Sequence, residues 1–424
     1  MLHSEFEIIE IGGLKLIFSP LKNIHTASVG LFLKIGSRYE KKSLKGIAHF
    51  LEHMVFKGSK KYSHRKIKRE IEGRGGSLNG FTSQEITAFY AHFLKKNCLL
   101  TLDILLDMVF APLLDKREID KERKVVLEEI KMYNDLPASR ASILLDSLLW
   151  PKHPLGEEVI GCENTVKAIN RKNLNDFHGR YYKPSNMVIS CSGHLSKSEI
   201  ISLIERKARD ILPKKINLRQ AKPKPLRGAR IKTENKGLEQ SHFCLGFRSV
   251  SYKSPDILKS HLLNIILGAN MSSRLFEELR EKRSLCYDVS TEIKRYKDSG
   301  AFVIHVGLDR KNILTALRSI IKEIEKILSK PVYYKELIRA KDYFLGQIAM
   351  SLERPQGRMF NFAESFITRG EIYSFETIKK KVDKITAGDI NRFCSRIFKL
   401  NNICISCVGN IDKTIDQKIK DIIY

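Results

Sequence analysis

The chain has 424 residues, of which 42% are hydrophobic and 8% aromatic, and this composition excludes disorder as a description of the whole chain. The length exceeds what one hydrophobic core usually serves, so it predicts about two domains. The formal net charge of +27 would suit a nucleic acid or an anionic membrane as partner. However, the lysines are spread along the chain with glutamates among them, which favours a solvated basic surface, and we expect neither partner.

The N-terminal segment, MLHSEFEIIEIGGLKLIF, predicts two strands that turn at Gly12 and Gly13. Its glutamates occupy positions where a secretory signal peptide would need a basic start and a continuous apolar stretch. The segment therefore predicts that the protein is cytoplasmic.

Residues 44–57 are the next predicted element, a helix for which Ser43 is a favourable N-cap. The segment contains AHFLEHMVF, which places two histidines and a glutamate in an otherwise apolar run. Burying such groups costs free energy unless they have partners, so their presence needs an explanation.

The three polar residues of this helix lie on one face. At 100° per residue, His49 and His53 are about 40° apart, and Glu52 lies about 60° to one side of His49. Imidazoles at positions i and i+4 can bind one Zn²⁺, and the neighbouring carboxylate can take a proton from a zinc-bound water whose pKa falls to about 7. The alternative is a pair of satisfied core histidines with a glutamate at the helix edge. The order HxxEH favours the metal site.

The longest apolar region, CLLTLDILLDMVFAPLL, follows at residues 98–114. It contains two aspartates and a proline, which a membrane span would not tolerate easily. The region therefore predicts a core helix.

A second long helix is predicted to start near Lys116, in the segment DKREIDKERKVVLEEIKMYND. Its Glu122 and Glu129 lie about 20° apart along one face. Val125 and Val126 between them indicate that the face is partly buried, so a carboxylate on it needs a partner. Zinc is one possible partner for Glu129, with Glu122 behind it, and an ordinary solvated acidic face is the other interpretation. Spacing alone does not choose between them.

The sequence contains an internal duplication, because residues 166–197 align with residues 382–413 without a gap. The identical positions in the first copy are Val166, Ile169, Asn175, Phe177, Arg180, Lys183, Asn186, Ile189, Ser190, Cys191, Gly193 and Lys197. Each copy reads as a helix, an apolar strand, a glycine and a further amphipathic helix. A repeat of this period indicates a duplicated domain rather than a solenoid.

The mixture of strands and long helices predicts the α/β class (α+β two-layer), with two homologous domains that are each a sheet covered by helices. The basic segment LPKKINLRQAKPKPLRG at residues 212–228 lacks periodicity and contains prolines, so it is the predicted linker. The predicted domains are residues 1–220 and 221–424.

The eight cysteines lie mostly within apolar runs, which predicts buried and reduced thiols. Cys404 and Cys407 form a CxxC sequence, but in the strand-like run ICISCV their odd separation points them to opposite faces. A shared metal or a redox pair is therefore not expected there.

The motifs GSRYEKKSLKGIAHFLEHMVFKGS, SLNGFTSQEITAFYAHF, ERKVVLEEIKMYNDLP and HPLG together resemble the M16 metallopeptidases, the family of pitrilysin, insulinase and mitochondrial processing peptidase. The resemblance covers nearly the whole chain, including the duplication. It is nearest to short bacterial members similar to the processing-peptidase β subunit, and it implies a zinc metalloendopeptidase of the inverzincin type.

The resemblance implies a role for each candidate site residue in the first half of the chain. His49 and His53 would bind zinc, with one ion per chain, and Glu52 would be the general base. Glu129 would be the third ligand and Glu122 its supporting residue. The residues that would pair with an extended substrate backbone at a sheet edge are Asn79, Gly80, Phe81 and Thr82.

The second half lacks HxxEH but contains GANMSSRLFEELREKRSLCYDV, which resembles the family segment whose Arg and Tyr contact substrate. These map onto Arg280 and Tyr287, and Tyr287 would donate a hydrogen bond to the developing oxyanion. The family usually has Gly where this chain has Ser284. If that position requires positive φ, Ser costs about 1 kcal/mol or more.

The resemblance also implies the substrate and partners. Zinc and the Glu52 base would hydrolyse peptides or unfolded protein segments. Because the family's active chamber needs more domains than this chain supplies, we expect a homodimer, or a heterodimer with a related M16 subunit. The alternative function is a catalytically silent M16-like structural or assembly subunit, in which zinc ligands are typically degraded.

Overall fold

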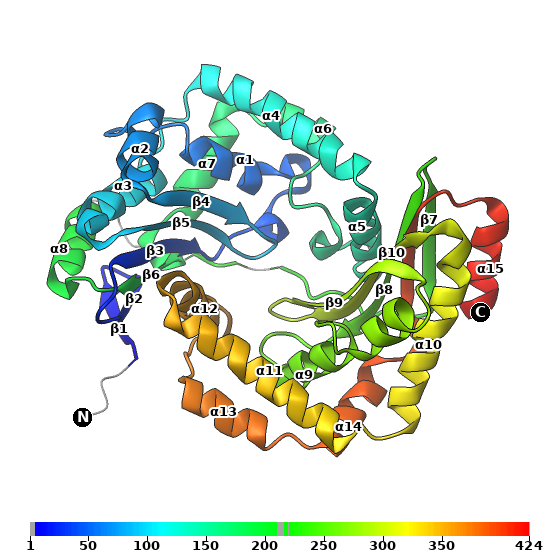
Figure 1. The fold of residues 1–424 in the computed structure, drawn as a ribbon. Helices are drawn as coiled ribbons and strands as arrows, with labels where there is room; N and C mark the ends of the chain where they lie inside the picture. Colours follow the sequence, from blue (N-terminus) through cyan, green and yellow to red (C-terminus); the bar gives the residue numbers. More distant parts are fainter. Residues whose placement is uncertain (1–4, 210–215, 219, 424) are drawn as a thin grey trace. The chain divides into compact units, whose positions relative to one another are not determined.

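The computed structural model describes residues 5–209, 216–218 and 220–423, and the chain divides into two compact units (Figure 1). Unit 1 contains the described residues of Met1–Lys131, Glu158–Gln220 and Ala349–Ser374, and unit 2 contains those of Met132–Glu157, Ala221–Ile348 and Phe375–Tyr424. One of the places where the chain passes from unit 1 to unit 2 lies between Gln220 and Ala221. The units differ from contiguous halves in that each includes one segment from the other half of the sequence.

Unit 1 is built on a six-stranded sheet in the order β1-β2-β6-β3-β5-β4. Its strands are β1 (Glu7–Ile11), β2 (Leu14–Pro20), β3 (Thr26–Leu33), β4 (Ser77–Thr82), β5 (Thr87–Leu94) and β6 (Met187–Gly193). Its helices are α1 (Ile47–Val55), α2 (His64–Ile71), α3 (Cys98–Phe110), most of α4 (Lys116–Asp135), α6 (Glu163–Ala168), α7 (Arg171–Tyr181), α8 (Lys197–Ala208) and α12 (Pro355–Arg369).

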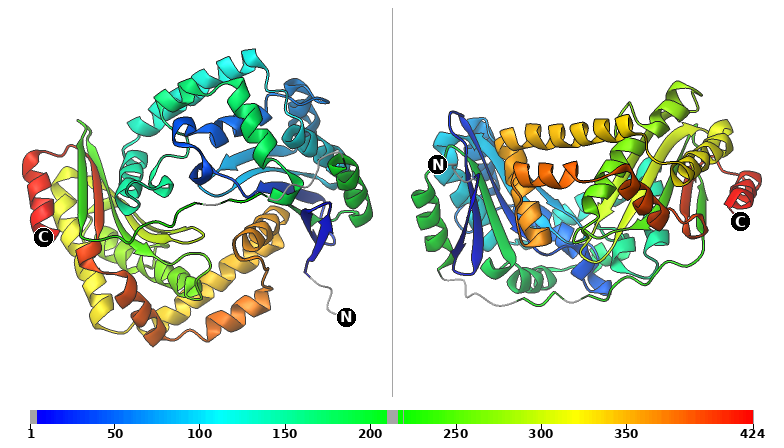
Figure 2. Two further views of the ribbon diagram at one scale, coloured as in Figure 1. Left: turned by 180° about the vertical axis from the view of Figure 1, so that it is seen from behind. Right: turned by 90° about the horizontal axis from the view of Figure 1, so that it is seen from below.

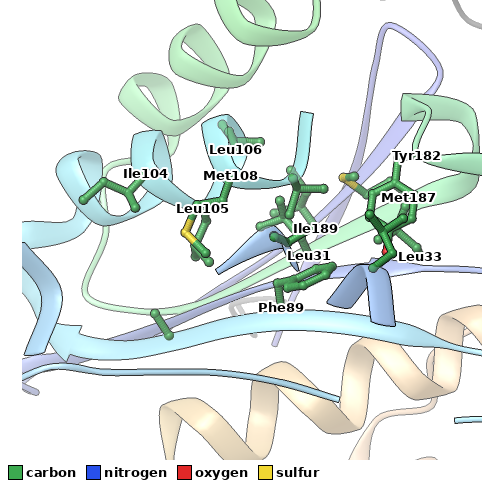
Figure 3. Packing of buried hydrophobic residues seen from close by; sticks show 14 of the residues in the cluster. Leu31, Leu33, Phe89, Ile104, Leu105, Leu106, Met108, Tyr182, Met187 and Ile189 are labelled. Atoms are coloured by element: carbon green, nitrogen blue, oxygen red, sulfur yellow. The ribbon is translucent and has the colours of Figure 1, made fainter. Parts of the chain in front are cut away.

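The sheet of unit 1 is covered on both faces. Leu31 and Leu33 of β3 face the side of α1, α3 and α7, where they pack with residues of α3 and β6 (Figure 3). Phe32 between them faces the other side and packs against Met359 and Ala363 of α12. Figure 1 shows α12 on the side of this sheet away from α1 and α7. This alternation is the period of two expected of a strand buried on both faces. A helix that is distant in sequence thus completes the N-terminal sheet.

Several predicted elements of unit 1 are confirmed. β1 and β2 form an antiparallel pair, and Gly12 and Gly13 between them have φ of 54° and 87°. Left-handed φ at both central residues is the requirement of a type I′ two-residue hairpin turn, and glycine meets it at little cost. The apolar region at residues 98–114 forms the core helix α3, of which most residues are buried. Within the described residues, no helix combines the length and the apolar character needed to cross a membrane.

Unit 2 is built on a five-stranded sheet in the order β7-β11-β8-β10-β9. Its strands are β7 (Arg230–Asn235), β8 (Gln240–Ser249), β9 (Cys286–Arg295), β10 (Gly300–Asp309) and β11 (Cys404–Gly409). Its helices are α5 (Pro137–Leu149), α9 (Ile257–Leu267), the π-helix η7 (Phe276–Glu281), α10 (Ile313–Ser329), most of α11 (Tyr334–Glu353), α13 (Phe375–Asp383), α14 (Ala387–Ile397) and α15 (Lys413–Ile423).

The sheet of unit 2 also has two covered faces. Leu245 and Ile304 face α10 and α15, which lie side by side (Figure 2). Cys244 and Val303 face α5, the segment that comes from the N-terminal half. The predicted opposite orientation of Cys404 and Cys407 is confirmed, because the former packs with α5 and the latter packs on the α10 face. Seven of the eight cysteines are buried, and Cys162 is exposed.

The duplication is confirmed element by element. The helix, short turn, strand and helix of residues 171–208 recur at residues 387–423 with matching starts for both helices. β6 pairs parallel with β2 and antiparallel with β3, and β11 pairs parallel with β7 and antiparallel with β8. The two sheets therefore share one topology over five strands, in which β9 takes the terminal place that β4 has in unit 1, and β1 has no counterpart in the sheet of unit 2.

The predicted linker at residues 212–228 has neither helix nor strand in its described residues, 216–218 and 220–228. Residues 212–215 and 219 lie outside the described part of the chain.

Candidate metal centre

The start of α1 differs from the prediction of a helix over residues 44–57 with Ser43 as its cap. The helix runs from Ile47 to Val55, and Ser43 lies in a preceding 3₁₀ turn. The residue before the helix is Gly46, whose φ is 91°, and a Cβ there would come within 2.4 Å of the Ile160 carbonyl oxygen. The buried carboxylate of Glu40 accepts hydrogen bonds from the backbone amides of Gly46 and Ala48, in place of a serine cap. Tertiary contacts therefore determine this boundary.

Three side chains bring possible metal-ligating atoms together at the middle of α1 and α4. His49 Nε2 lies 3.8 Å and His53 Nε2 lies 3.6 Å from Glu129 Oε2. The ligating atoms of the three residues all lie within 4.8 Å of one another, and no other group of three such residues meets that condition among the described residues. Spacing alone left open whether Glu129 belongs to a metal site or to a solvated acidic face. In the structure, the face of α4 that carries Glu129 lies against both histidines.

A second carboxylate of α4 lies behind this group. Glu122 Oε1 lies 2.8 Å from His53 Nδ1, and its Oε2 lies 2.5 Å from Lys57 Nζ. Although burial opposes the charge, these two partners hold the pKa of Glu122 below its usual range. Because a carboxylate accepts a hydrogen bond from Nδ1–H, Glu122 leaves the Nε2 lone pair of His53 directed toward Glu129 and available to a metal.

The Glu52 carboxylate lies beside the same group and is oriented from the sheet. Thr82 of β4 donates a hydrogen bond of 2.7 Å to Glu52 Oε2. Burial raises the pKa of Glu52, the Thr82 hydrogen bond opposes this, and the charge of Glu129 adds to the increase. A buried carboxylate with a raised pKa next to possible metal ligands has the properties of a general base.

The two histidines of the site differ in how readily their imidazoles take up a proton. Burial and the neighbouring His53 lower the pKa of His49 to about 3, so its imidazole is neutral and able to bind a metal. Burial also acts to lower the pKa of His53, but the hydrogen bond that His53 donates to Glu122 and the surrounding carboxylates outweigh it, and the pKa is raised. The Nδ1 of His49 is buried without a hydrogen-bond partner in the described structure.

These residues fit a bound Zn²⁺. Imidazole and carboxylate are common zinc ligands, and two atoms bound at about 2.0–2.1 Å to a tetrahedral ion lie roughly 3.3–3.4 Å apart, close to the observed separations. Three carboxylates (Glu52, Glu122 and Glu129) gather here with Lys57 as the ammonium group bound to one of them. A divalent cation would compensate this excess negative charge.

The helix α4 begins where the sequence predicts, but one of the apolar residues on its acidic face is exposed. α4 begins at Lys116, and the carboxylate of Asp115 accepts from the amides of the first turn. Val126 is fully buried, but Val125 is 50% exposed. The face is therefore partly buried as predicted, but Val125 does not contribute to its burial. Val126 is the apolar residue that packs beneath the acidic face.

The predicted substrate-binding residues Asn79 to Thr82 lie on β4, which is the terminal strand of the sheet. The Ser83 amide donates to the Ile86 carbonyl in the hairpin loop. Because hydrogen-bonded pairs alternate along an antiparallel ladder, the backbone groups of Asn79 and Phe81 point to β5. Those of Gly80 and Thr82 then point to the open edge, where another extended chain can pair with them.

The remaining predicted residues, Arg280 and Tyr287, belong to unit 2. Arg280 is exposed on η7, and its guanidinium lies 5.0 Å from the Phe276 ring centroid. Tyr287 is 45% exposed on β9, and its hydroxyl lies 3.0 Å from His242 Nε2. Sequence reasoning did not find His242, nor the bond between Thr82 and Glu52, because each links segments that are far apart along the chain.

The position of Ser284 has the backbone conformation that glycine favours, since its φ is 49°. It follows η7, where its amide donates to the Arg280 carbonyl. Ser284→Gly is therefore expected to raise the free energy of unfolding by about 0.5–1 kcal/mol, the relieved strain minus the entropy cost of glycine. Urea denaturation measures the change. Ser290→Gly, in the exposed face of a regular strand, is the matched control and should lower stability instead.

Comparison with known proteins finds relatives that align with most of this chain. A family model described as Insulinase (Peptidase family M16) matches residues 17–163, and a model described as Peptidase M16 inactive domain matches residues 168–344. An uncharacterized zinc protease of Bacillus subtilis, YmxG, is 31% identical over 388 residues, which cover 91% of this chain and 94% of that protein. An uncharacterized zinc protease of Rickettsia bellii is 32% identical over 388 residues, with coverages of 91% and 93%.

Solved structures share the fold. A protease from Helicobacter pylori has a TM-score of 0.90 at 23% identity, covering 95% of this chain and 99% of that one. A protein from Pseudomonas fluorescens described as a peptidase M16 inactive domain has a TM-score of 0.88 at 18% identity, covering 96% of this chain and 99% of that one. The resemblance seen in the sequence is confirmed by the family models and by relatives that align over nearly the full length, and the chain belongs to peptidase family M16.

Proposed function

We propose that this chain is a zinc-dependent endopeptidase that hydrolyses peptides or unfolded protein segments. The observation that carries the proposal is the convergence of His49 Nε2, His53 Nε2 and the Glu129 carboxylate, with the oriented carboxylate of Glu52 beside them. His49, His53 and Glu129 would hold one Zn²⁺ per chain. The names of the relatives as zinc proteases support this proposal.

Each residue of the site has a part in peptide hydrolysis. When bound, Zn²⁺ supplies a Lewis acid that makes a water molecule nucleophilic near neutral pH. Glu52 takes a proton from the attacking water and later delivers it to the nitrogen of the leaving amine as the peptide C–N bond breaks. The hydrogen bond from Thr82 to Oε2 keeps the other carboxylate oxygen free for this proton. Glu122 holds the His53 ring.

The open edge of β4 supports an extended peptide as substrate. Backbone groups of Gly80 and Thr82 can pair with a substrate strand, and this pairing reads the main chain rather than particular side chains. Thr82 thus contributes its backbone to the substrate and its side chain to Glu52. Arg280 and Tyr287 are proposed to contact substrate, with the tyrosine hydroxyl donating to the developing oxyanion.

We further propose that the active species is a dimer, either of two copies of this chain or with a related M16 subunit. The support is the family resemblance, in which the chamber needs more domains than this chain contains. Sedimentation equilibrium of the purified chain gives the mass of the assembly, and a monomer at micromolar concentration would contradict the homodimer.

The proposed activity is tested by metal analysis and a quenched-peptide assay on the same preparation. We expect one zinc per chain, cleavage of members of a diverse peptide library, loss of cleavage after chelation and recovery on adding Zn²⁺. Zinc binding without cleavage of any peptide would contradict the enzyme and favour the catalytically silent M16-like subunit instead.

Glu122→Gln is expected to weaken zinc binding by about 10–100-fold, because the neutral amide accepts a weaker hydrogen bond from His53 and leaves Lys57 without its carboxylate. Competition against a chromophoric chelator measures the zinc dissociation constant. Glu128→Gln, on the exposed side of the same helix, is the matched control and should not change it. Equal affinities for Glu122→Gln and wild type would show that this carboxylate does not support the site.

A further inference from the structure

Tyr287 occupies a β-bulge at the start of β9. The pairing of β9 with β10 shifts between Gly307, opposite Asp288, and Leu308, opposite Cys286, so Tyr287 has no partner of its own. Cys286 and Val289 pack on the face of the sheet that α10 covers. The two consecutive residues between them, Tyr287 and Asp288, both contact histidines on the other face of the sheet. A bulge re-aims a side chain in this way, and bulges are frequent next to active sites.

A chain of polar contacts runs from the Tyr287 hydroxyl across three strands. The hydroxyl lies 3.0 Å from His242 Nε2 on β8. His242 Nδ1 lies 3.3 Å from His305 Nε2 on β10. His305 Nδ1 lies 3.4 Å from Asp288 Oδ2, back on β9. Gly307 completes the arrangement, since a Cβ at this position would lie 2.5 Å from the tyrosine hydroxyl.

The carboxylate at one end gives this chain a direction. Asp288 can only accept, so His305 carries its proton on Nδ1, and its Nε2 accepts from His242 Nδ1. His242 Nε2 then accepts from the hydroxyl of Tyr287. When both imidazole rings are neutral, the hydroxyl hydrogen of Tyr287 therefore points to His242 and away from the solvent-exposed side of the tyrosine.

We propose that His242, held by His305 and Asp288, is a positioning residue that sets the direction in which the Tyr287 hydroxyl donates. This inference rests on the proposed peptidase function. One proton taken up by the histidine pair makes His242 Nε2 a donor to the tyrosine oxygen and leaves the hydroxyl hydrogen free for a substrate carbonyl. Asp288 stabilises that state, because its negative charge faces the protonated pair.

The groups around the histidine pair both lower and raise the pKa of its two imidazoles. Burial lowers the pKa of His242 and of His305, and Asp288 opposes this for both. Glu292 on β9 acts on His305 in the same sense as Asp288. On its other side His242 faces Val408 of β11, which carries no charge. The pair is therefore neutral at rest and is protonated more readily where a further negative charge develops beside the tyrosine.

Kinetics on single and double variants test the coupling. His242→Ala should lower kcat about tenfold with little change in KM, and His242→Gln, whose amide can accept from or donate to the hydroxyl, should restore most of the loss. In a Tyr287→Phe background, His242→Ala should have no further effect. Asp383→Ala, which breaks an exposed ion pair elsewhere in unit 2, is the control and should keep the wild-type kcat. An equal loss from His242→Ala in both backgrounds would overturn the proposal, because the histidine would then act without the tyrosine.

A spectroscopic measurement tests the geometry independently of activity. Two-bond ¹H–¹⁵N correlation spectra of protein labelled with ¹⁵N-histidine report the tautomer of each ring, and His242→Gln and His305→Gln assign the two signals. We expect the Nδ1–H form for both residues. The Nε2–H form at His242 would overturn the proposal. If the wild type proves inactive but both rings show Nδ1–H, the proposed function fails while the arrangement of the pair stands.

Discussion

Glu52→Gln is expected to lower kcat for peptide cleavage by about 10²–10⁴-fold while zinc content stays at that of the wild type. Glutamine has no carboxylate to take the proton of the attacking water, but its side-chain oxygen can still accept the hydrogen bond from Thr82. The three proposed ligands, His49, His53 and Glu129, are unchanged, so metal binding and catalysis should separate. Quenched-peptide kinetics and metal analysis on one preparation measure both quantities.

The matched control is Glu128→Gln, which removes a carboxylate from the same helix as Glu129 but on its solvent side, where it pairs with Lys131. This variant should keep both zinc and activity. Wild-type kcat in zinc-loaded Glu52→Gln would exclude this carboxylate as the base. Loss of zinc together with activity would instead assign Glu52 a part in holding the site together.

Asp146→Ala is expected to lower the free energy of unfolding by about 3–5 kcal/mol, because it leaves the buried ammonium group of Lys294 without its counter-charge. Both carboxylate oxygens of Asp146 on α5 lie 2.7 Å from Lys294 Nζ on β9, and Ser142 adds a contact of 3.3 Å. Burial by itself lowers the pKa of Lys294, and the charges of Asp146 and Glu292 raise it, so the lysine is charged.

Trp150 is a built-in probe for this measurement, since it is the single tryptophan of the chain and is buried in unit 2. Urea denaturation followed by its fluorescence gives the stability of the unit that contains the pair. Adding Lys294→Met to Asp146→Ala should recover most of the loss, because the double variant buries no unpaired charge. Asp383→Ala, which breaks an exposed ion pair in the same unit, should leave the transition unchanged. A small effect of Asp146→Ala alone would show that water reaches Lys294.

The two helices of the metal centre show how much local sequence determines. His49, Glu52 and His53 share one face because helical geometry depends only on spacing, and the start of α4 follows from hydrogen bonds within its first turn. The turn at Gly12 and Gly13 and the alternation that separates Cys404 from Cys407 are local in the same sense.

The partners of these residues were decided only by tertiary structure. α1 begins at Ile47 because Glu40 and the neighbouring Ile160 backbone surround Gly46, not because of the nearby serine. Glu129 is selected from an acidic face because α4 lies across α1, which helical spacing cannot show.

Packing between distant segments also completes both sheets. α12 lies on the sheet of unit 1 and α5 on that of unit 2, although each comes from the other half of the chain. The histidines beside Tyr287 come from two further strands of its sheet. The sequence of this protein by itself determines its helices, turns and strand faces, because their energies depend on residues that are only a few positions apart. The tertiary structure decides which of those faces meet, because burial and charge pairing depend on neighbours that local spacing does not record.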